Sequence, residues 1–511
     1  MTGHVFVIQG DIRHLACDAF LHATDKALSA TGKWRTAAPD VENRLDPAER
    51  EAFQAEERFT LPLAERHGYP NEPTPILTAV PYEGVSHERE FAPRLLEFFE
   101  LGAAIARERG VTAAQSKRER PLLAVPLFGV GGGGAGSIRG RVFRFVYGAS
   151  LRAAQEHDVD VAIVLRDARD YALAQMIRLE RGDAWSELDD ELKVEARRLG
   201  ELAQDARLVP FMGAGVSMSA GAPSWDGLVA RLADAAGIHP DMIAALKEHD
   251  VLDQAAFVRH EFERRFHDDR APFAQAVIDA VRVERYGIAP PLLAALEAEQ
   301  AITLNYDRLF EDAAYDAGRP RRVIPGPSSG SERWLLKLHG SVDDPSSIVL
   351  TREDYLGFNA DRAALSSLVK ATLMTRHLLF VGFGVKDPHF HEIVHDVRRA
   401  IPEKDQPFGT VLTLNKDRVM HVLWDRDLRF VLLPSPRVLE IFLDAVLAYG
   451  ATSHSYLLAK GYLSTLSRAD QAVATALSTM VASVPPGARE GTAWSAVAGM
   501  LARFGWDGEP G

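Results

Sequence analysis

The sequence predicts an α/β protein built from more than one domain. At 511 residues the chain is longer than a single hydrophobic core usually serves. In two separate stretches, short apolar segments of strand length alternate with amphipathic helical segments, which is typical of sheets covered by helices. A composition of 47% hydrophobic and 25% charged residues is close to the globular average, so we expect a folded chain.

The first α/β stretch occupies roughly the first 180 residues. Helix Phe91–Arg109 is predicted from an apolar stripe that includes Leu95, Phe98 and Ile105. The segment between residues 25 and 75 is polar and interrupted by prolines, and its elements are not assigned. The other elements expected here are strands Val5–Gln9, Ala19–Ala23, Leu122–Leu127 and Val159–Leu165, and helix Arg141–His157.

A charged helical segment, Trp185–Ala206, separates this stretch from the second one. Ile324–Gly330 is expected to be a loop, and beyond Leu447 only helices are expected, at Ser453–Ser483 and Trp494–Phe504. The strands of the second stretch are expected at Leu208–Met212, Ala301–Leu304, Leu335–His339, Leu378–Gly382, Thr410–Leu414 and Leu428–Leu433. We therefore divide the chain into a first domain (1–182), a helical connector (183–206), a second domain (207–450) and a helical tail (451–511).

Charge and cysteine content exclude several classes of protein. The formal charge of −13 argues against a general nucleic-acid binder, although backbone amides can still hold a nucleotide phosphate. The lone Cys17, which we expect in the core, excludes intrachain disulfides, four-cysteine zinc sites and cysteine-ligated iron–sulfur clusters. No apolar run approaches the ~20 residues of a membrane span. No signal peptide is evident, so we expect a cytoplasmic protein without membrane contact.

A glycine-rich segment, Gly213–Pro223, directly follows the first strand of the second domain. Glycines there permit a tight turn and let backbone amides approach a pyrophosphate, although by itself such a turn could equally serve packing. Parallel strands place their carboxyl ends at one edge of a sheet, where α/β proteins bind ligands. Three further strands end in polar or glycine residues, at Thr303–Asp307, Lys337–Ser341 and Val381–Gly384 with Asp387.

As an ordered set, these segments resemble the sirtuin family, whose Rossmann-like domain binds NAD+. The family's GAG(I/V)S-x-SxG-x-P loop is similar to Gly213–Pro223, its TQNxD strand end to Thr303–Asp307, its HG pair to His339-Gly340, and its ribose loop to Gly382–Gly384. The resemblance implies that NAD+ is bound by Gly213, Ala214, Gly215, Ser217, Pro223, Trp225, Thr303, Gly382, Gly384 and Asp387.

The chain also departs from the family's deacylases. Residues Ser341–Leu379 contain no cysteine, so the family's zinc ribbon cannot form, and no metal is expected. Leu304 replaces a glutamine, and the continuation Trp225–Leu228 resembles the zinc-free bacterial sirtuin-like effectors. That branch cleaves NAD+ itself and often acts in antiphage defence, so the resemblance implies an NAD+ hydrolase with NAD+ as its substrate.

Three residues are candidate catalytic groups. Cleavage of the nicotinamide–ribose bond develops oxocarbenium charge, which a positioned water and local electrostatics can support. Asn305 can orient the water or the carboxamide, and Asp307 can accept from the carboxamide. His339, titrating near neutrality, can act as a base at the ribose hydroxyls or the water. The structural alternatives are a turn for Asn305, a helix N-cap for Asp307 and a hydrogen-bonded strand end for His339.

A competing motif follows the ribose-type loop. The sequence His391–His395 matches H-E-x-x-H, which in zinc peptidases places two imidazoles on one helix face. The same helix needs Phe390, Ile393 and Val394 as its apolar face, so the match also fits a packed surface helix. A metallopeptidase is therefore kept as a minor alternative.

The first domain resembles the macro domain, an ADP-ribose-binding fold. Its Gln9–Ile12 strand end is similar to that family's GDI motif, and Val125–Gly136 to its later glycine loop. The resemblance implies that Asp11 contacts adenine and that Gly129, Gly131 and Gly132 contact the diphosphate. The family's asparagine-containing strand is missing, so we expect ligand sensing rather than hydrolysis.

Taken together, the sequence predicts an NAD+-depleting effector of antiphage defence (abortive infection) that is restrained until a trigger arrives. A homo-oligomer is expected, with a second defence protein as a possible partner. The enzyme alternatives are an NAD-dependent deacylase or an ADP-ribosyltransferase. The non-enzyme alternative is a module that only binds an ADP-ribose-type signal.

Overall fold

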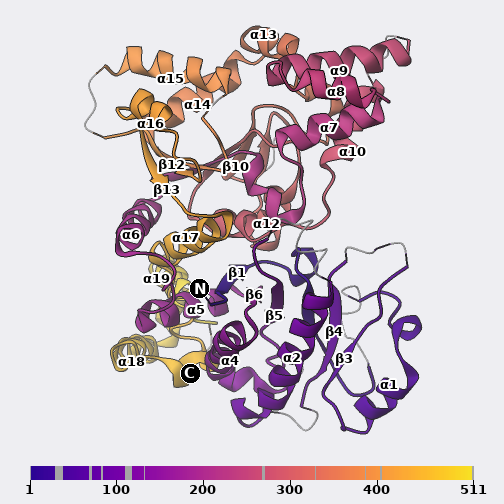
Figure 1. Cartoon of the computed structure of the whole chain (residues 1–511). Helices are drawn as coiled ribbons and strands as arrows, with labels where there is room; N and C mark the ends of the chain where they lie inside the picture. The colour runs from indigo at the N-terminus through magenta and orange to yellow at the C-terminus, as the bar shows by residue number, and fades with distance from the viewer. Residues whose placement is uncertain are drawn as a thin grey trace. The chain divides into compact units, whose positions relative to one another are not determined.

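The computed structural model describes residues 2–28, 38–67, 69, 72–81, 85–109, 118–131, 133–267, 271–327, 330–385, 387–402 and 406–508. They form two compact units (Figure 1). The first unit comprises Met1–Glu187 together with Ala451–Gly511, and the second is Leu188–Gly450. This division differs from the sequence-based boundaries, because the tail is part of the first unit and the connector belongs to the second from Leu188 onward. No helix among the described residues has the length and apolar character needed to cross a membrane.

The first unit is built on a six-stranded sheet with the strand order β1-β6-β5-β2-β4-β3. All neighbouring strands are parallel except the pair β3 and β4. The strands are β1 (Val5–Gln9), β2 (Ala19–Thr24), β3 (Thr60–Pro62), β4 (Thr74–Ala79), β5 (Leu122–Pro126) and β6 (Asp160–Leu165). The helices are α1 (Pro47–Gln54), α2 (Ala92–Glu108), α4 (Arg139–His157), α5 (Ala168–Arg181), α18 (Arg468–Ser483) and α19 (Thr492–Arg503).

Strand β3 lies in the stretch between residues 25 and 75 that the sequence left unassigned, and β4 begins at the end of that stretch. All six residues of β4 are buried, including Thr74 and Thr78. A fully buried strand that carries threonines and a proline has neither the alternation nor the apolar run by which strands are recognised. The lone Cys17 is buried at 3% exposure, as expected for a core residue.

The tail segment 451–508 packs against α4 and α5 of the first unit. Tyr462 donates a hydrogen bond to Asp170 Oδ1 at 2.9 Å, and the same carboxylate accepts from Arg139. A Cβ on Gly140 would lie 2.4 Å from Thr465 Oγ1, so a glycine is needed at that contact. The tail is less helical than expected, because a 3₁₀ turn over Lys460–Thr465 precedes α18 and buries Tyr462 and Thr465.

The second unit contains a seven-stranded sheet with the order β13-β12-β11-β7-β8-β10-β9. Every pair of neighbouring strands is parallel. The strands are β7 (Leu208–Met212), β8 (Gln300–Thr303), β9 (Arg322–Ile324), β10 (Trp334–Lys337), β11 (His377–Val381), β12 (Gly409–Thr413) and β13 (Leu428–Leu432). After β7, the chain forms β8, β9 and β10 on one side of that strand. It then crosses to the other side, where it forms β11, β12 and β13. Strand β7 is therefore the switch point, where such sheets open a crevice at their carboxyl ends.

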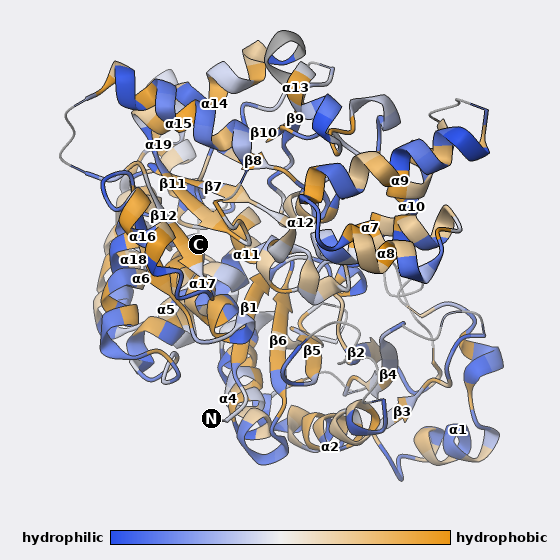
Figure 2. Ribbon diagram, turned by 45° about the horizontal axis from the view of Figure 1, so that its top comes forward, coloured by the Kyte–Doolittle hydropathy of each residue, from blue (hydrophilic) through white to orange (hydrophobic). Residues whose placement is uncertain are grey.

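Helices cover both faces of this sheet, and α7, α9 and α10 add a smaller helical subdomain. Figure 2 shows strands β7 and β11 as hydrophobic, while helix α9 carries residues of both kinds. Buried aromatic side chains such as Phe211, Phe380 and Phe390 pack together in the main core. The helices are α6 (Asp190–Gln204), α7 (Trp225–Ala235), α8 (Pro240–Leu246), α9 (Val251–Arg265), α10 (Ala271–Val281), α11 (Ala289–Ala294), α12 (Leu309–Asp316), α13 (Arg352–Asp361), α14 (Ala363–Thr375), α15 (Pro388–Ala400), α16 (Arg418–Trp424) and α17 (Pro436–Tyr449).

Candidate active site

A cavity of about 320 Å³ opens in the second unit at the carboxyl ends of β7, β8, β10 and β11. The three predicted catalytic residues, Asn305, Asp307 and His339, all line it. The sequence-predicted binding residues that line it are Gly213, Ala214, Ser217, Pro223, Trp225, Gly382, Gly384 and Asp387. Segments separated by up to about 170 positions in the sequence are thus brought to one cavity, as the switch-point argument predicts.

Gly215 is not a lining residue; it serves the packing of one glycine loop on another. Its amide donates to Gly382 O at 3.1 Å, and a Cβ on Gly215 would lie 2.6 Å from Gly382 Cα. Gly382 has φ +64 and would direct its own Cβ to within 2.5 Å of Val216 N. The loops after β7 and β11 therefore touch backbone to backbone, which only glycine allows.

Thr303, also predicted to bind the dinucleotide, is absent from the cavity lining. Its buried hydroxyl donates to Met212 O at 3.3 Å and accepts from the Asn305 amide at 3.0 Å. The threonine thus joins the ends of β7 and β8 and fixes the start of the loop that carries Asn305.

A short hydrogen-bond chain connects Asn305 to Asp307 through Ser217. Asn305 Nδ2 donates to Ser217 Oγ at 3.1 Å, and that hydroxyl donates to Asp307 Oδ2 at 2.8 Å. The second oxygen of Asp307 accepts from the Leu309 amide at 3.0 Å, at the start of α12. Both sequence interpretations of Asp307, as a helix-capping carboxylate and as a group in the site, are therefore present in the structure. With these contacts the amide and the carboxylate are held at fixed positions in the cavity wall.

His339 is 4% exposed and lies just beyond β10. Burial lowers the pKa of its imidazole to about 4, and the neighbouring His389 and Arg362 act in the same direction, against Asp387. The expectation that His339 titrates near neutrality is therefore wrong, because desolvation disfavours the charged ring. At neutral pH the ring is uncharged and retains a lone pair that can accept a proton.

Tyr355, on α13, is a residue of the site that the sequence reasoning missed. Its hydroxyl donates to Asp387 Oδ2 at 2.8 Å and lies 3.5 Å from His339 Nδ1. Asp387 in turn caps α15 by accepting from the Phe390 amide at 3.0 Å. His389 stacks on the Tyr355 ring with centroids 4.3 Å apart. Nothing in the local sequence marks Tyr355, because only the fold places α13 beside the end of β11.

Two histidine clusters bear on metal binding. His339, Asp387 and His389 each offer a ligand atom within 4.8 Å of the others. However, Asp387 accepts from Tyr355, and His389 Nε2 lies 3.0 Å from Tyr355 O, so these groups already serve the protein's own hydrogen bonds. His391 of the H-E-x-x-H motif has Nε2 2.7 Å from Val385 O. Among the described residues, His391 and His395 are not part of any group of three potential ligands.

In the first unit a cavity of about 360 Å³ is lined by Asp11 and by Arg13, Arg139 and Arg166 among others. Asp11 is buried, yet hydrogen bonds from Arg13 and the charge of Arg166 hold the pKa of its carboxyl below its usual value. The lining also includes Asp167 and Asp170, so the predicted adenine-contacting carboxylate lies among three guanidinium groups and two further carboxylates.

Of the described residues of the 125–136 segment, Pro126 and Leu127 line that cavity, whereas its described glycines do not. Gly129 has φ +73, and a Cβ there would lie 2.6 Å from the Phe91 ring, so packing alone requires this glycine. Gly131 has open space around it. Gly132, the third predicted contact, lies outside the described residues.

Comparisons with known proteins include a family model that matches within the second unit. Residues 299–427 match the model of the SIR2-like domain family. The chain is 28% identical over 233 residues to the NAD(+) hydrolase ThsA of Enterococcus faecium, covering 43% of this chain and 46% of that one. It is 29% identical over 203 residues to the NAD(+) hydrolase ThsA of Bacillus cereus (strain MSX-D12), covering 38% and 40%.

A third relative is the Defense-associated sirtuin 2 of Bacillus subtilis, 24% identical over 225 residues that cover 42% of this chain and 21% of that one. The matched region thus spans less than half the length of each of these three relatives. Among solved structures, a macrodomain mutant from Oceanobacillus iheyensis aligns with a TM-score of 0.24 at 16% identity, over 33% of this chain and 88% of that one. The family match confirms the sirtuin-like pattern over residues 299–427, a span that includes Asn305, Asp307 and His339 and matches the SIR2-like domain, whereas the Gly213–Pro223 loop precedes the matched span.

Proposed function

We propose that this chain is an NAD+ hydrolase that releases nicotinamide and ADP-ribose. The observation that carries the proposal is the convergence of Asn305, Asp307 and His339 on one cavity, between two glycine loops at the switch point of a parallel sheet. Two relatives are named NAD(+) hydrolase, which supports it. No metal takes part in the proposed reaction.

The chemistry requires a water at C1′ of the nicotinamide ribose. The glycosidic bond breaks, nicotinamide leaves with the bonding pair, and water adds to C1′ and loses one proton. The neutral imidazole of His339 is the group that accepts a proton, from the water or from a ribose hydroxyl. Asn305, held by Ser217, orients the water or the carboxamide without ionising.

The rest of the cavity suits the dinucleotide. The Gly213–Pro223 loop follows β7 directly and lines the cavity with Gly213, Ala214, Ser217 and Pro223, where a pyrophosphate is expected. Trp225 lines the cavity and provides an aromatic wall for the nicotinamide ring, and its buried indole Nε1 has no hydrogen-bond partner among the described residues. A ligand oxygen can therefore accept from this indole.

For the biological role, we propose an effector of antiphage defence that depletes cytoplasmic NAD+ after activation and so causes abortive infection. The name of the Bacillus subtilis relative supports a role in defence. Such an enzyme needs restraint in an uninfected cell. We propose that an ADP-ribose-type ligand in the Asp11 cavity of the first unit, together with homo-oligomer contacts or a second defence protein, controls activity.

The deciding experiment measures nicotinamide release by the purified full-length chain, with and without an acyl-peptide and with candidate ADP-ribose-type activators. Release that does not depend on the acyl-peptide supports hydrolysis. Release only with the acyl-peptide, accompanied by deacylation, supports the deacylase alternative. ADP-ribosyl transfer to protein instead of free ADP-ribose supports the transferase. Nucleotide binding without any turnover under all conditions supports the signal-binding alternative.

A further inference from the structure

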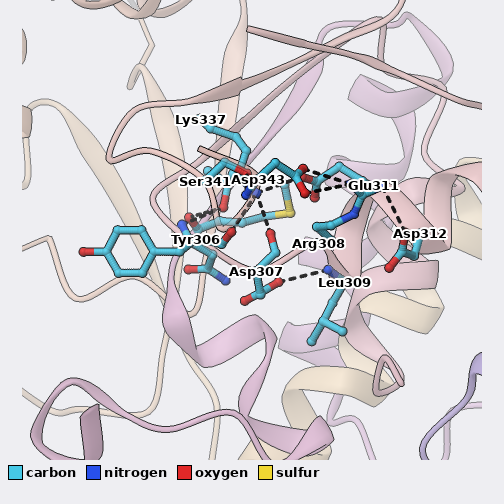
Figure 3. Close-up of polar contacts among 12 residues, drawn as sticks. Tyr306, Asp307, Arg308, Leu309, Glu311, Asp312, Lys337, Ser341 and Asp343 are labelled. Atoms are coloured by element: carbon cyan, nitrogen blue, oxygen red, sulfur yellow. Dashed lines mark hydrogen bonds and ion pairs between the residues drawn. The ribbon is translucent and has the colours of Figure 1, made fainter. Parts of the chain in front are cut away.

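Lys337, two residues before His339, is a buried cation beneath the active-site loop. Its side chain is 1% exposed, at the end of β10. Its ammonium donates to Tyr306 O at 3.1 Å, to Asp307 O, and to Glu311 Oε1 at 2.7 Å (Figure 3). The three donors of the ammonium are thus matched by three acceptors.

These acceptors belong to the segment that carries the proposed catalytic groups. Tyr306 and Asp307 follow Asn305 directly, and Glu311 lies in the first turn of α12, the helix that the segment leads into. The Tyr306 side chain points away from this cluster in Figure 3 and donates to the buried Val349 O at 2.8 Å. One ammonium therefore ties the end of β10, the backbone of the 305–307 loop and the start of α12 together.

Stability alone gives a weak reason for an ion pair at this place. The Glu311 side chain is 12% exposed, and its partial burial raises the pKa of its carboxyl despite the lysine. The desolvation penalty of such an ion pair offsets much of the attraction between its charges. A protein with two apolar side chains of similar volume in place of the pair is often equally stable. An apolar side chain cannot donate to two backbone carbonyls, however, so the contacts to Tyr306 O and Asp307 O are what a lysine uniquely supplies here.

We infer that Lys337 is a positioning residue, which holds the 305–307 backbone so that the Asn305 and Asp307 side chains face the substrate. The inference rests on the proposed NAD+ hydrolysis for its functional readout. Lys337 does not line the cavity, and so it acts through the loop and not on the substrate.

The test separates positioning from stability with three variants of the full-length chain. Lys337→Met removes the cation, Lys337→Met/Glu311→Met replaces the buried pair by two apolar side chains, and Glu311→Gln keeps the lysine while neutralising its partner. Lys370→Met is the matched control, because Lys370 forms a 2.7 Å ion pair with Asp396 on α14 and α15, away from the cavity. Thermal unfolding, kcat and KM are measured for each.

The inference expects kcat/KM to fall at least tenfold in both Lys337 variants, although the double variant unfolds near the wild-type temperature. Glu311→Gln is expected to cost less activity than Lys337→Met, and Lys370→Met to match the wild type. A double variant with wild-type stability and wild-type kcat/KM would overturn the inference, as would activity that follows unfolding temperature across the series.

If the wild type releases no nicotinamide under any condition, the proposed hydrolysis fails, and calorimetric binding of NAD+ to the same variants decides the role of Lys337 separately. At least tenfold weaker binding in the folded double variant would then support loop positioning. Wild-type binding would refute it.

Discussion

Ser217 Oγ donates a 2.8 Å hydrogen bond to Asp307 Oδ2 across 90 residues of sequence. The bond joins the glycine-rich loop after β7 to the loop after β8. Two of the segments that resemble sirtuin motifs are therefore one connected unit, and a change in either loop is expected to displace the other.

The first prediction concerns the proposed catalytic groups. Asn305→Ala and His339→Ala are each expected to lower the rate of nicotinamide release by at least ~10²-fold, the contribution typical of a positioned acid–base group. His395→Ala, on the exposed face of α15, is the matched control and is expected to keep the wild-type rate. Rates near the wild type in both site variants would remove the assignment.

The second prediction is the pH dependence of kcat/KM. Because the folded pKa of His339 is about 4, its basic form is fully populated from pH 8 down to about pH 5. The acid limb of the profile is therefore expected near pH 4 and not near 6.5. An acid limb centred at 6.5 that disappears in His339→Gln would contradict the buried, neutral imidazole.

The third prediction applies the same shift to stability. Burial lowers the pKa of both His339 and His377 to about 4, below the value of 6.5 expected in the unfolded chain. Folding thus favours the neutral rings, so their contribution is fully present above pH 6.5 and is lost as the pH falls toward 4. Chemical denaturation at pH 7.5, 6, 5 and 4.5 is expected to show a falling free energy of unfolding, with a smaller fall in His377→Gln.

The fourth prediction tests Tyr355. Tyr355→Phe removes the donor to Asp387 and is expected to cost about 1 kcal/mol of stability, the usual value for one hydrogen bond. It is also expected to lower kcat several-fold, because the hydroxyl that lies between Asp387 and His339 is then absent. Tyr315→Phe is the control, since that ring is 74% exposed. An unchanged kcat in Tyr355→Phe would reduce the residue to a structural role.

The fifth prediction concerns ligand binding to the first unit. Calorimetry on the full-length chain is expected to show binding of ADP-ribose or cyclic ADP-ribose, and Asp11→Ala is expected to weaken it. The second-unit cavity is saturated with NAD+ before the titration, so that binding there does not contribute to the measured heat. Asp183→Ala serves as the control, because Asp183 is exposed and forms an ion pair with Arg181. If Asp11→Ala leaves the affinity unchanged, the ligand does not bind at the Asp11 cavity.

The sequence was sufficient to predict the parts of the site that are local. Glycine runs after strands and polar strand ends are visible in the chain itself, and the rule that parallel strands end at one edge then brings Gly213, Asn305 and His339 together. At Gly215 and Thr303 the structure shows contacts between loops, which the motif alone did not reveal, because a motif does not distinguish a residue that faces the ligand from one that packs the loop.

Tyr355 and Lys337 could not be assigned from sequence for a different reason. Each acts through a contact with a segment distant in the chain, and single-sequence patterns carry no information on such pairs. The pKa of His339 was also beyond reach, since desolvation depends on everything packed around the ring. Strand β4 was not predicted because all of its residues are buried, so it shows no alternation of polar and apolar residues. The packing of the tail on the first unit was not predicted because it depends on contacts between segments distant in the sequence.

The interrupted first unit has a consequence for synthesis on the ribosome. Domains generally fold as units as the chain emerges, N-terminal parts first. Here Leu188–Gly450 is complete before residues 451–508 are made, whereas the first unit still lacks Tyr462, the partner of Asp170. The inserted unit can therefore close its core earlier than the unit that precedes it in the sequence, and a nascent chain passes through a stage with a finished second unit and an unfinished first one.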